Sequence, residues 1–425
     1  MKVFFDTVGC RLNQAEIERM AAEFRLAGHE IVETPNQADL VIINSCAVTA
    51  AATSDSRQKV RQAYKAGAAS IVLTGCWATV SPQAARQLTG ITQIFSNEEK
   101  QKIPQLLLGR SISLYELEPL ERKPLPGTHH RTRAFIKVQD GCDNHCTFCI
   151  TRVARGRSWS VSREEILAEV RHAESGGTHE VVLTGVNLGA WGKDLGKGEG
   201  LADLVRYLLA HSNVERLRLS SIEPWEMVTD FLSLWENERM CRHLHIPLQS
   251  GCGEILKRMG RRTSPDQFRS LIGVIRKTIP DATITTDVIV GFAGESEAEF
   301  SQSLDFVKEM DFAGGHVFRF SPREGTPAWD LPNRVNGRVA HARSLQMREV
   351  LLESEHRYWG NFIGRKMDVF WESSTQIKNG QWKLHGLTSN YLPVSAYGAE
   401  DRWNKIDTVS LEQKGADSLE GIISG

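Results

Sequence analysis

Three cysteines, Cys142, Cys146 and Cys149, stand close together in the sequence GCDNHCTFCI. A closed structural zinc site and a self-contained ferredoxin cluster each need four protein ligands, and no fourth cysteine follows nearby. The spacing therefore predicts a cubane iron–sulfur cluster with one iron left open to a small molecule. A zinc site completed by His145 or by a distant ligand is the alternative.

Length and composition limit the possible classes of protein. A chain of 425 residues predicts two or three domains, and 41% hydrophobic with 24% charged residues is typical of a soluble globular protein. Neither a signal peptide nor a membrane-spanning segment is expected. Eight cysteines without secretory features indicate reduced, metal-bound thiols in the cytoplasm.

The net charge of −1 means that nucleic-acid binding would need local basic patches. Two stretches of basic side chains are candidates, one around the cysteine motif and one before the last domain. They are Arg131, Arg133, Lys137, Arg152, Arg155, Arg157 and Arg163, and Arg334, Arg338, Arg343 and Arg348.

The first segment, residues 1–120, alternates short apolar strands with helical patterns, which predicts a Rossmann-like parallel sheet with crossover helices. Cys10, Cys46 and Cys76 each follow one of the first three strands. Because the carboxyl ends of parallel strands line one crevice, we expect these thiols to converge there. Each is also expected to precede a helix, whose dipole would lower the thiol pKa. Buried apolar cysteines at strand ends are the alternative.

The middle segment, residues 128–357, repeats this alternation with six candidate strands, which predicts a partial (β/α)6 barrel. In such barrels the functional groups follow the carboxyl ends of the strands, and the cysteine motif lies just after the first one. Polar or small residues follow the later strands. They are Gly185, Asn187, Ser220, Ser221, Glu223, Gln249, Ser250, Arg323 and Glu324. Cys241 and Cys252 have no partners at ligand spacing and are expected to be ordinary packed or surface thiols.

The last segment, residues 360–425, changes to short β-rich pieces and predicts a small β-barrel. Such modules hold single-stranded nucleic acid through stacked aromatic side chains. The candidates are Trp371, Trp382, Tyr391 and Trp403. A role in filling a small core is equally consistent with the sequence.

With Phe148 directly before the last cysteine, the central motif resembles that of radical S-adenosylmethionine (SAM) enzymes. Over nearly its whole length the chain resembles the methylthiotransferase family. Six stretches are most similar to the branch that acts on N6-threonylcarbamoyladenosine in tRNA: VGCRLNQAE, RAFIKVQDGCDNHCTFC, LTGVNLGAWG, RLSSIEP, HIPLQSGC and SPREGTPA. The stretch GLTSNYLPV resembles the TRAM β-barrel that this family uses for RNA.

The resemblance implies two 4Fe-4S clusters, a radical cluster on Cys142, Cys146 and Cys149 and an auxiliary cluster on the three N-terminal cysteines. It also implies that SAM binds near the radical cluster. The residues expected around SAM are Gly185, Asn187, Ser220, Glu223 and Asp287. Catalytic residues beyond the cluster ligands are not identified.

The implied reaction inserts a methylthio group at C2 of the adenine next to the anticodon. The implied partners are a tRNA anticodon stem-loop and an electron donor such as flavodoxin or ferredoxin, and the chain is expected to be a monomer without membrane contact. Three alternatives remain: an isopentenyladenosine methylthiotransferase, a methylthiotransferase of a ribosomal-protein aspartate, and a non-catalytic iron–sulfur or zinc protein that binds RNA.

Overall fold

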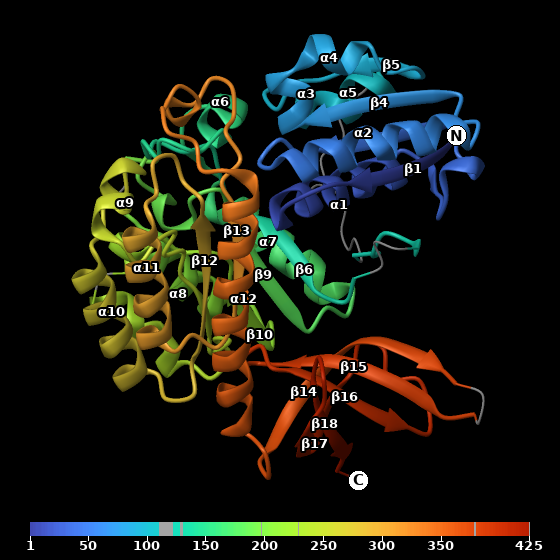
Figure 1. Ribbon diagram of the computed structural model, residues 1–425. Helices are drawn as coiled ribbons and strands as arrows, with labels where there is room; N and C mark the ends of the chain where they lie inside the picture. Colours follow the sequence, from blue (N-terminus) through green and yellow to red (C-terminus); the bar gives the residue numbers. More distant parts are fainter. Residues whose placement is uncertain (110–121, 128–130, 197, 228, 378–379, 425) are drawn as a thin grey trace.

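Three parts follow one another along the chain in the computed structural model (Figure 1): an N-terminal sheet with helices, a central barrel and a terminal β-barrel. The structure describes residues 1–109, 122–127, 131–196, 198–227, 229–377 and 380–424. The expected boundaries at residues 120 and 128 lie outside these ranges. Among the described residues, no helix is both long and apolar enough to cross a bilayer.

The N-terminal part is a parallel sheet with the strand order β2-β1-β3-β4-β5. Its strands are β1 Lys2–Thr7, β2 Glu30–Ile31, β3 Leu40–Ser45, β4 Ser70–Gly75 and β5 Ile91–Ile94. The connecting helices are α1 Arg11–Leu26, α2 Ala50–Lys65, α3 Cys76–Val80, α4 Pro82–Arg86 and α5 Ile103–Leu108, with short 3-10 turns at Pro35–Gln37 and Lys100–Lys102. The predicted Rossmann-like sheet is confirmed. The strand order reverses between β1 and β3, and such switch points are where open α/β sheets form their ligand crevice.

Both faces of this sheet are covered, because alternate side chains of each strand point to opposite sides. Val3 and Phe5 pack with α1 and α5 on one face. Phe4 and Val41 pack with α2 to α4 on the other. The strands are therefore almost continuously apolar, as buried parallel strands are.

The central part consists of two parallel three-stranded sheets, β6-β9-β10 and β11-β12-β13. The strands are β6 Ala134–Lys137, β9 Glu180–Thr184, β10 Arg216–Leu219, β11 His243–His245, β12 Thr283–Val290 and β13 Gly315–Arg319. Bridges from Leu217 to Met240 and from Ser221 to His245 join the two sheets. β6 and β13 do not pair with each other, so the predicted partial barrel is confirmed and one side of it is open.

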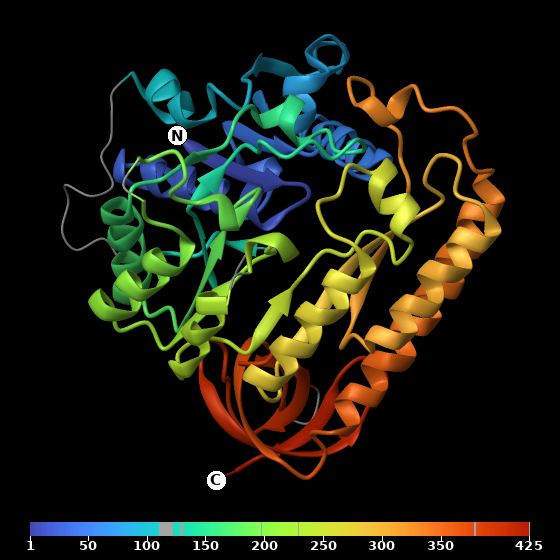
Figure 2. The same cartoon turned by 90° about the vertical axis from the view of Figure 1, so that its left-hand side faces the viewer.

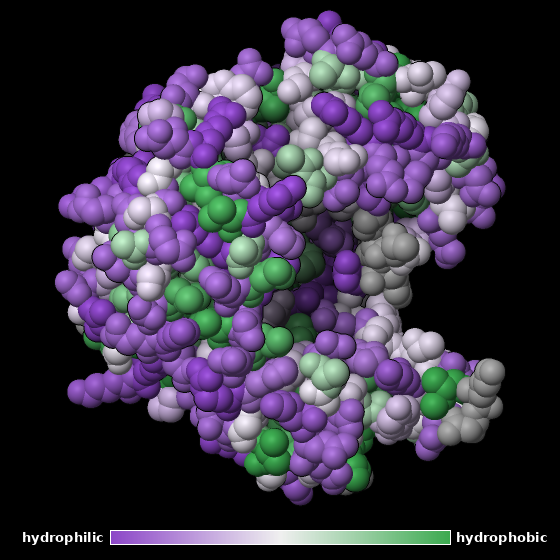
Figure 3. Space-filling model, in the orientation of Figure 1, coloured by the Kyte–Doolittle hydropathy of each residue, from purple (hydrophilic) through white to green (hydrophobic). Residues whose placement is uncertain are grey.

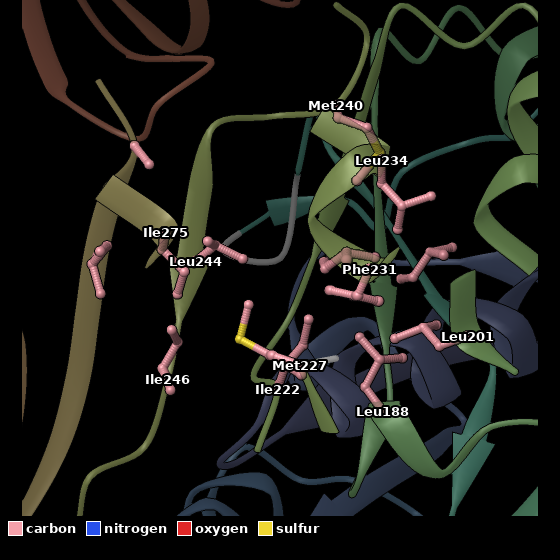
Figure 4. Packing of buried hydrophobic residues seen from close by; sticks show 14 of the residues in the cluster. Leu188, Leu201, Ile222, Met227, Phe231, Leu234, Met240, Leu244, Ile246 and Ile275 are labelled. Atoms are coloured by element: carbon pink, nitrogen blue, oxygen red, sulfur yellow. The ribbon is translucent and has the colours of Figure 1, made fainter. Parts of the chain in front are cut away.

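Helices cover the outside of this barrel. They are α7 Arg163–Ser175, α8 Leu201–His211, α9 Gly253–Arg258, α10 Pro265–Thr278, α11 Glu297–Met310 and α12 Gly337–Gly360. The short helix α6 Thr151–Arg155 packs on α3 of the N-terminal part instead. Short 3-10 segments lie at Leu188–Ala190, Pro224–Glu226, Thr229–Glu236 and Pro327–Trp329. Figure 4 shows part of the main apolar core, in which Phe231, Met240 and Leu244 lie among leucines and isoleucines.

The N-terminal part lies against the open side of the barrel. Helix α1 packs on the edge strand β6. The loop that contains Val48 and Thr49 lines a cavity together with Phe318 and Arg319 of the other edge strand, β13. Residues of the N-terminal part therefore contact both edge strands, β6 and β13, on the open side of the barrel.

The terminal part is a closed barrel in the order β14-β15-β16-β18-β17. Its strands are β14 Lys366–Gln376, β15 Trp382–Thr388, β16 Pro393–Gly398, β17 Ile406–Lys414 and β18 Leu419–Ile423. The predicted small β-barrel is confirmed. Trp371 is fully buried in its core and donates a hydrogen bond to Asp407, so this side chain cannot stack on RNA as the sequence suggested.

The long helix α12 was not expected from the sequence. It runs along the side of the central barrel and ends at the terminal β-barrel (Figures 1 and 2), where Trp359 joins the core of that barrel. Three arginines of the second predicted basic patch lie on α12. One of them, Arg343, is buried and paired with Glu295 at 2.8 Å, so it is not available to a nucleic acid.

The Arg343–Glu295 pair also provides a test of the fold. Burial raises the pKa of Glu295, and removal of the guanidinium leaves this carboxylate enclosed without its cation. Arg343→Ala should lower the free energy of unfolding by about 3–5 kcal/mol. The exposed Arg338→Ala on the same helix is the control and should change it by less than about 0.5 kcal/mol. Equal thermal and denaturant stability of the two variants would contradict this account of how α12 is attached.

Candidate functional site

The loop with Cys142, Cys146 and Cys149 lies between β7 Gln139–Asp140 and β8 Trp159–Ser160, which pair as an antiparallel ladder. Thr147 fixes its middle, because its amide donates to the Met259 carbonyl at 2.9 Å and its own carbonyl accepts from Ala328 at 2.9 Å. The loop is thus held by the end of α9 and by the 3-10 turn after β13.

The three thiols of this loop influence one another. Burial raises the pKa of Cys142 to about 11, the Asn144 amide lowers it, and the neighbouring Cys149 and Cys146 raise it further. All three side chains are partly exposed. Thiols that lie this close and remain reachable fit a cluster with an open position.

The N-terminal cysteines also converge. Cys10 is the N-cap residue of α1, Cys46 follows β3, and Cys76 is the first residue of α3. Each of Cys10 and Cys76 affects the pKa of Cys46. Gly9 has a φ of 99°, and a Cβ there would lie 2.7 Å from the Cys46 sulfur, so this approach requires glycine.

The expected lowering of the thiol pKa is wrong for Cys10 and Cys46. Burial raises the pKa of Cys46 to about 11 and also raises that of Cys10. The desolvation of a thiolate outweighs the helix dipole here. Cys46 also stands several residues before α2 rather than at its start.

The donor sets suit clusters better than a single ion. Among the described residues, no three Cys, His, Asp or Glu side chains are grouped closely enough to bind one metal ion together. Each cysteine of a cubane binds a different iron, so cluster ligands need not meet at one point. Two sets of three thiols match the soft ligands that iron–sulfur clusters require.

A buried charge network joins the two cysteine sets. Arg155, at the end of α6, donates to Asp140 at 2.9 Å on the barrel side and to Asn13 at 2.7 Å and Glu16 at 2.9 Å on α1. Lys100 contacts the same Glu16 at 2.7 Å. Burial alone would raise the pKa of Glu16, but these cations hold it well below its usual value. Cys10 and Cys76 are close enough to Arg155 to raise the pKa of its guanidinium.

The residues expected around SAM lie at the carboxyl ends of the barrel strands. Glu223 accepts from Arg261 at 3.0 and 2.5 Å, and Arg261 also reaches the Cys146 sulfur at 3.7 Å. Three other side chains carry enclosed polar atoms that have no hydrogen-bond partner in the described parts of the chain, namely Asn187 Oδ1, Ser220 Oγ and Asp287 Oδ1. Gly185 ends its strand against Gln139, where a Cβ would lie 3.0 Å from the amide oxygen. Such unsatisfied atoms fit a polar ligand beside the cluster loop.

A cavity of about 190 Å³ lies between the cluster loop and the loop that follows Cys46. Its lining includes Cys149 and Asp287 from the barrel and Val48 and Thr49 from the loop after Cys46. Phe148, Ile289, Phe318 and Phe320 make most of the rest apolar. The residues after Cys46 and the residues of the cluster loop therefore face the same space. A larger cavity of about 570 Å³ between α1, β6 and α7 touches none of the six cysteines.

The first predicted basic patch is only partly on the surface. Arg133, Lys137 and Arg155 turn inward into ion pairs, while Arg131, Arg152 and Arg157 are exposed. Cys241 and Cys252 are buried, as expected of packed thiols. The sequence analysis did not identify the roles of Glu16 and Arg261. Glu16 stands three residues after Asn13 in the VGCRLNQAE stretch, so both polar side chains lie on one face of α1, where each accepts a hydrogen bond from Arg155.

The fold and the cluster loop define a radical SAM enzyme. Residues 136–307 match the model of the Radical SAM superfamily, and residues 2–96 match that of the Uncharacterized protein family UPF0004. The radical SAM methyltransferase TsrM from Kitasatospora setae, solved with cobalamin and a [4Fe-4S] cluster, superposes with a TM-score of 0.57 over 77% of each chain at 14% identity. That likeness supports the fold alone.

Full-length relatives identify the family. The threonylcarbamoyladenosine tRNA methylthiotransferase MtaB of Thermotoga maritima is 37% identical over 99% of this chain and 98% of its own. The MtaB protein of Bacillus subtilis is 32% identical over 99% and 95%. A tRNA-2-methylthio-N(6)-dimethylallyladenosine synthase of Clostridium tetani is 30% identical over 98% and 95%. The chain belongs to the methylthiotransferase family of radical SAM enzymes, which implies a 4Fe-4S cluster and SAM as cofactors.

Arg155 and Arg157 offer a matched test of the charge network. Arg155→Gln should remove the guanidinium that Glu16 and Asp140 share, with Lys137 left as the more distant cation between them, and should loosen the contact between α1 and the barrel. Hydrogen exchange should then rise in residues 13–16 and 137–140, by an amount corresponding to about 3–5 kcal/mol. Arg157 is 92% exposed, and Arg157→Gln should leave exchange unchanged. Equal exchange in both variants would mean that other contacts hold the two parts together.

Proposed function

We propose that this chain is a tRNA methylthiotransferase that inserts a methylthio group at C2 of N6-threonylcarbamoyladenosine next to the anticodon. The observation that carries the proposal is the cavity that Cys149 lines together with Val48 and Thr49, which follow Cys46. A reaction that joins a sulfur source to an activated carbon needs both centres to face one substrate. The relatives named for this nucleoside support the choice.

Each cysteine set has its own role in this proposal. Cys142, Cys146 and Cys149 would hold the radical 4Fe-4S cluster, and Cys10, Cys46 and Cys76 an auxiliary one. Bound there, the clusters and SAM supply the radical chemistry that an inert aryl C–H bond requires. Asn187, Ser220 and Asp287 would satisfy polar groups of SAM with their unpartnered oxygens, and Gly185 and Glu223 would shape the same pocket.

The protein side chains also control access to the reaction. Phe148, Ile289 and Phe318 line the shared cavity with apolar surface and would exclude water from a reactive intermediate. Arg261 neutralises Glu223 beside Cys146, so that the carboxylate does not repel the electrons added to the cluster. No general base is needed for these tasks.

The division of labour along the chain follows from this assignment. Residues 1–120 would carry the auxiliary cluster, residues 128–357 the radical SAM chemistry, and residues 360–425 the RNA contacts. We further propose that the protein works in the cytoplasm as a monomer and receives electrons from a flavodoxin or ferredoxin.

Other substrates of the same family are the competing proposals. The Clostridium tetani relative is named for dimethylallyladenosine, which keeps an isopentenyl substrate open. A ribosomal-protein aspartate would need no RNA contacts. For a tRNA substrate, log affinity should fall with log salt by about 0.7 per neutralised phosphate in single-stranded regions. A flat salt response would favour the protein substrate.

Mass spectrometry of tRNA nucleosides tests the proposal directly. Cells that contain the protein should yield 2-methylthio-N6-threonylcarbamoyladenosine, and a deletion strain should accumulate the nucleoside without the methylthio group. Re-expression of the protein should restore the product. Loss of the methylthio group from isopentenyladenosine instead would move the enzyme to the other tRNA branch.

Single cysteine variants separate the two clusters. Cys142→Ala should abolish SAM cleavage, because only two thiolates would remain for the radical cluster. Cys10→Ala should keep SAM cleavage but stop methylthio insertion, because the auxiliary cluster loses a ligand. Cys252→Ala lies outside both sets and serves as the control. Methylthiolated product from the Cys10 variant would overturn the assignment of roles.

A further inference from the structure

The inside of the central barrel is polar, although its outside is a large apolar core. Inward-facing side chains that are paired across neighbouring strands lie at the same height in the barrel, and each such pair is here called a level. Asp287 pairs with His316, and Ile289 pairs with Phe318. One level lower, His245 pairs with Thr285. The lumen therefore changes from apolar near the cluster loop to imidazoles, hydroxyls and carboxylates deeper down. Figure 3 shows a hollow with hydrophilic walls between the three parts of the molecule.

Tyr391 of the terminal β-barrel closes the far end of this lumen. Its ring stacks on His243, with centroids 4.2 Å apart and planes at 10°. Three guanidiniums surround the ring: Arg218 at 4.9 Å, Arg133 at 5.7 Å and Arg11 at 5.9 Å from its centroid. The Tyr391 backbone has a φ of 70°, a conformation that a bulky residue adopts only when its surroundings require it.

Two of these arginines are neutralised by carboxylates. Arg218 forms a two-pronged pair with Glu180 at 2.6 and 3.1 Å, and both side chains are fully buried. Arg133 pairs with Glu372 at 2.6 Å and lies 3.8 Å from Glu180. Their charges are therefore satisfied within the protein.

Arg11 differs from both. In the parts of the chain that the structure describes, it forms no ion pair with a carboxylate, and it donates a hydrogen bond to the Tyr391 hydroxyl at 3.0 Å. The side chain is half-buried, so solvent in the lumen still reaches it. A partly buried cation without a carboxylate partner favours the binding of an anion.

The position of Arg11 ties this cation to the reaction. It directly follows Cys10, and it lies close enough to His316, one level below Phe318, to affect the pKa of that imidazole. The proposal requires that C2 of the adenine faces the cysteine sets. The N6 substituent of this adenine would then extend into the lumen, toward Arg11. Threonylcarbamoyl carries a carboxylate at the end of this substituent, whereas isopentenyl carries only carbon.

We propose that Arg11 binds the carboxylate of the N6 substituent and thereby selects threonylcarbamoyladenosine over adenosines with an apolar substituent. This inference rests on the proposed function, since it assigns the specificity of the same site. An isopentenyl group in this place would cover the guanidinium without supplying a counter-charge. The free-energy cost of covering this unpaired cation would contribute to specificity as much as the ion pair with the carboxylate.

The test compares two synthetic anticodon stem-loops. One carries threonylcarbamoyladenosine, and in the other the threonine carboxylate is converted to a neutral methylamide. Wild-type protein should prefer the carboxylate by about 10- to 100-fold in kcat/KM and in stem-loop affinity, the range expected for one charge-assisted hydrogen-bond contact. Arg11→Gln should abolish this preference, so that kcat/KM is about equal on the two stem-loops. Arg11→Lys should retain part of the preference.

The controls separate specificity from folding and from phosphate contacts. Arg61→Gln removes an exposed charge from the same N-terminal part and should keep the full preference. Iron content and SAM cleavage without RNA should be unchanged in Arg11→Gln. If that variant loses iron, the wild-type comparison and Arg11→Lys decide the question.

Two results would overturn the inference while the proposed function stands. One is equal wild-type activity on both stem-loops. The other is a uniform loss in Arg11→Gln on both, which would make Arg11 a phosphate contact. Absence of methylthiolation on either stem-loop by active, iron-loaded wild-type protein would instead contradict the proposed function.

Discussion

Arg155 holds two separate parts of the chain together through its buried contact with Glu16 and Asp140. This contact fixes helix α1, and with it Cys10, against the loop of the radical SAM barrel. Breaking such a pair is costly because each remaining charge stays buried. The contact therefore sets the distance between two cysteine sets that come from separate parts of the chain.

The incomplete barrel makes this arrangement useful. Because β6 and β13 do not pair, the lumen is open on one side, and the N-terminal sheet and the terminal β-barrel approach it from two directions. Arg11 and Tyr391, from these two parts, meet inside it. The substrate pocket therefore belongs to no single domain, and its polarity differs from the apolar core that the outer helices form.

Most of the longer strands, four of the central helices and the three parts were predictable from the sequence, since apolar periodicity and strand-end cysteines depend only on local pattern. The edge strands β2 and β5 and the last strand β18 were not predicted. Helix α12 was missed, because its apolar side chains do not gather on one face and its arginines suggested a surface patch. The inward turn of Arg133 and Arg155 was unpredictable for a related reason: their carboxylate partners Glu372 and Glu16 lie far away in sequence. The raised thiol pKa of Cys46 likewise depends on burial that only the assembled fold creates.

In the proposed enzyme, each set of three thiolates holds one 4Fe-4S cluster. Iron and sulfide analysis of anaerobically reconstituted protein, combined with Mössbauer spectroscopy, counts these clusters. We expect about eight irons per chain as two 4Fe-4S clusters, and about four in a variant with Cys10, Cys46 and Cys76 all replaced by alanine. Wild-type protein with only about four irons, or a triple variant that keeps about eight, would rule out a second cluster on the N-terminal thiols.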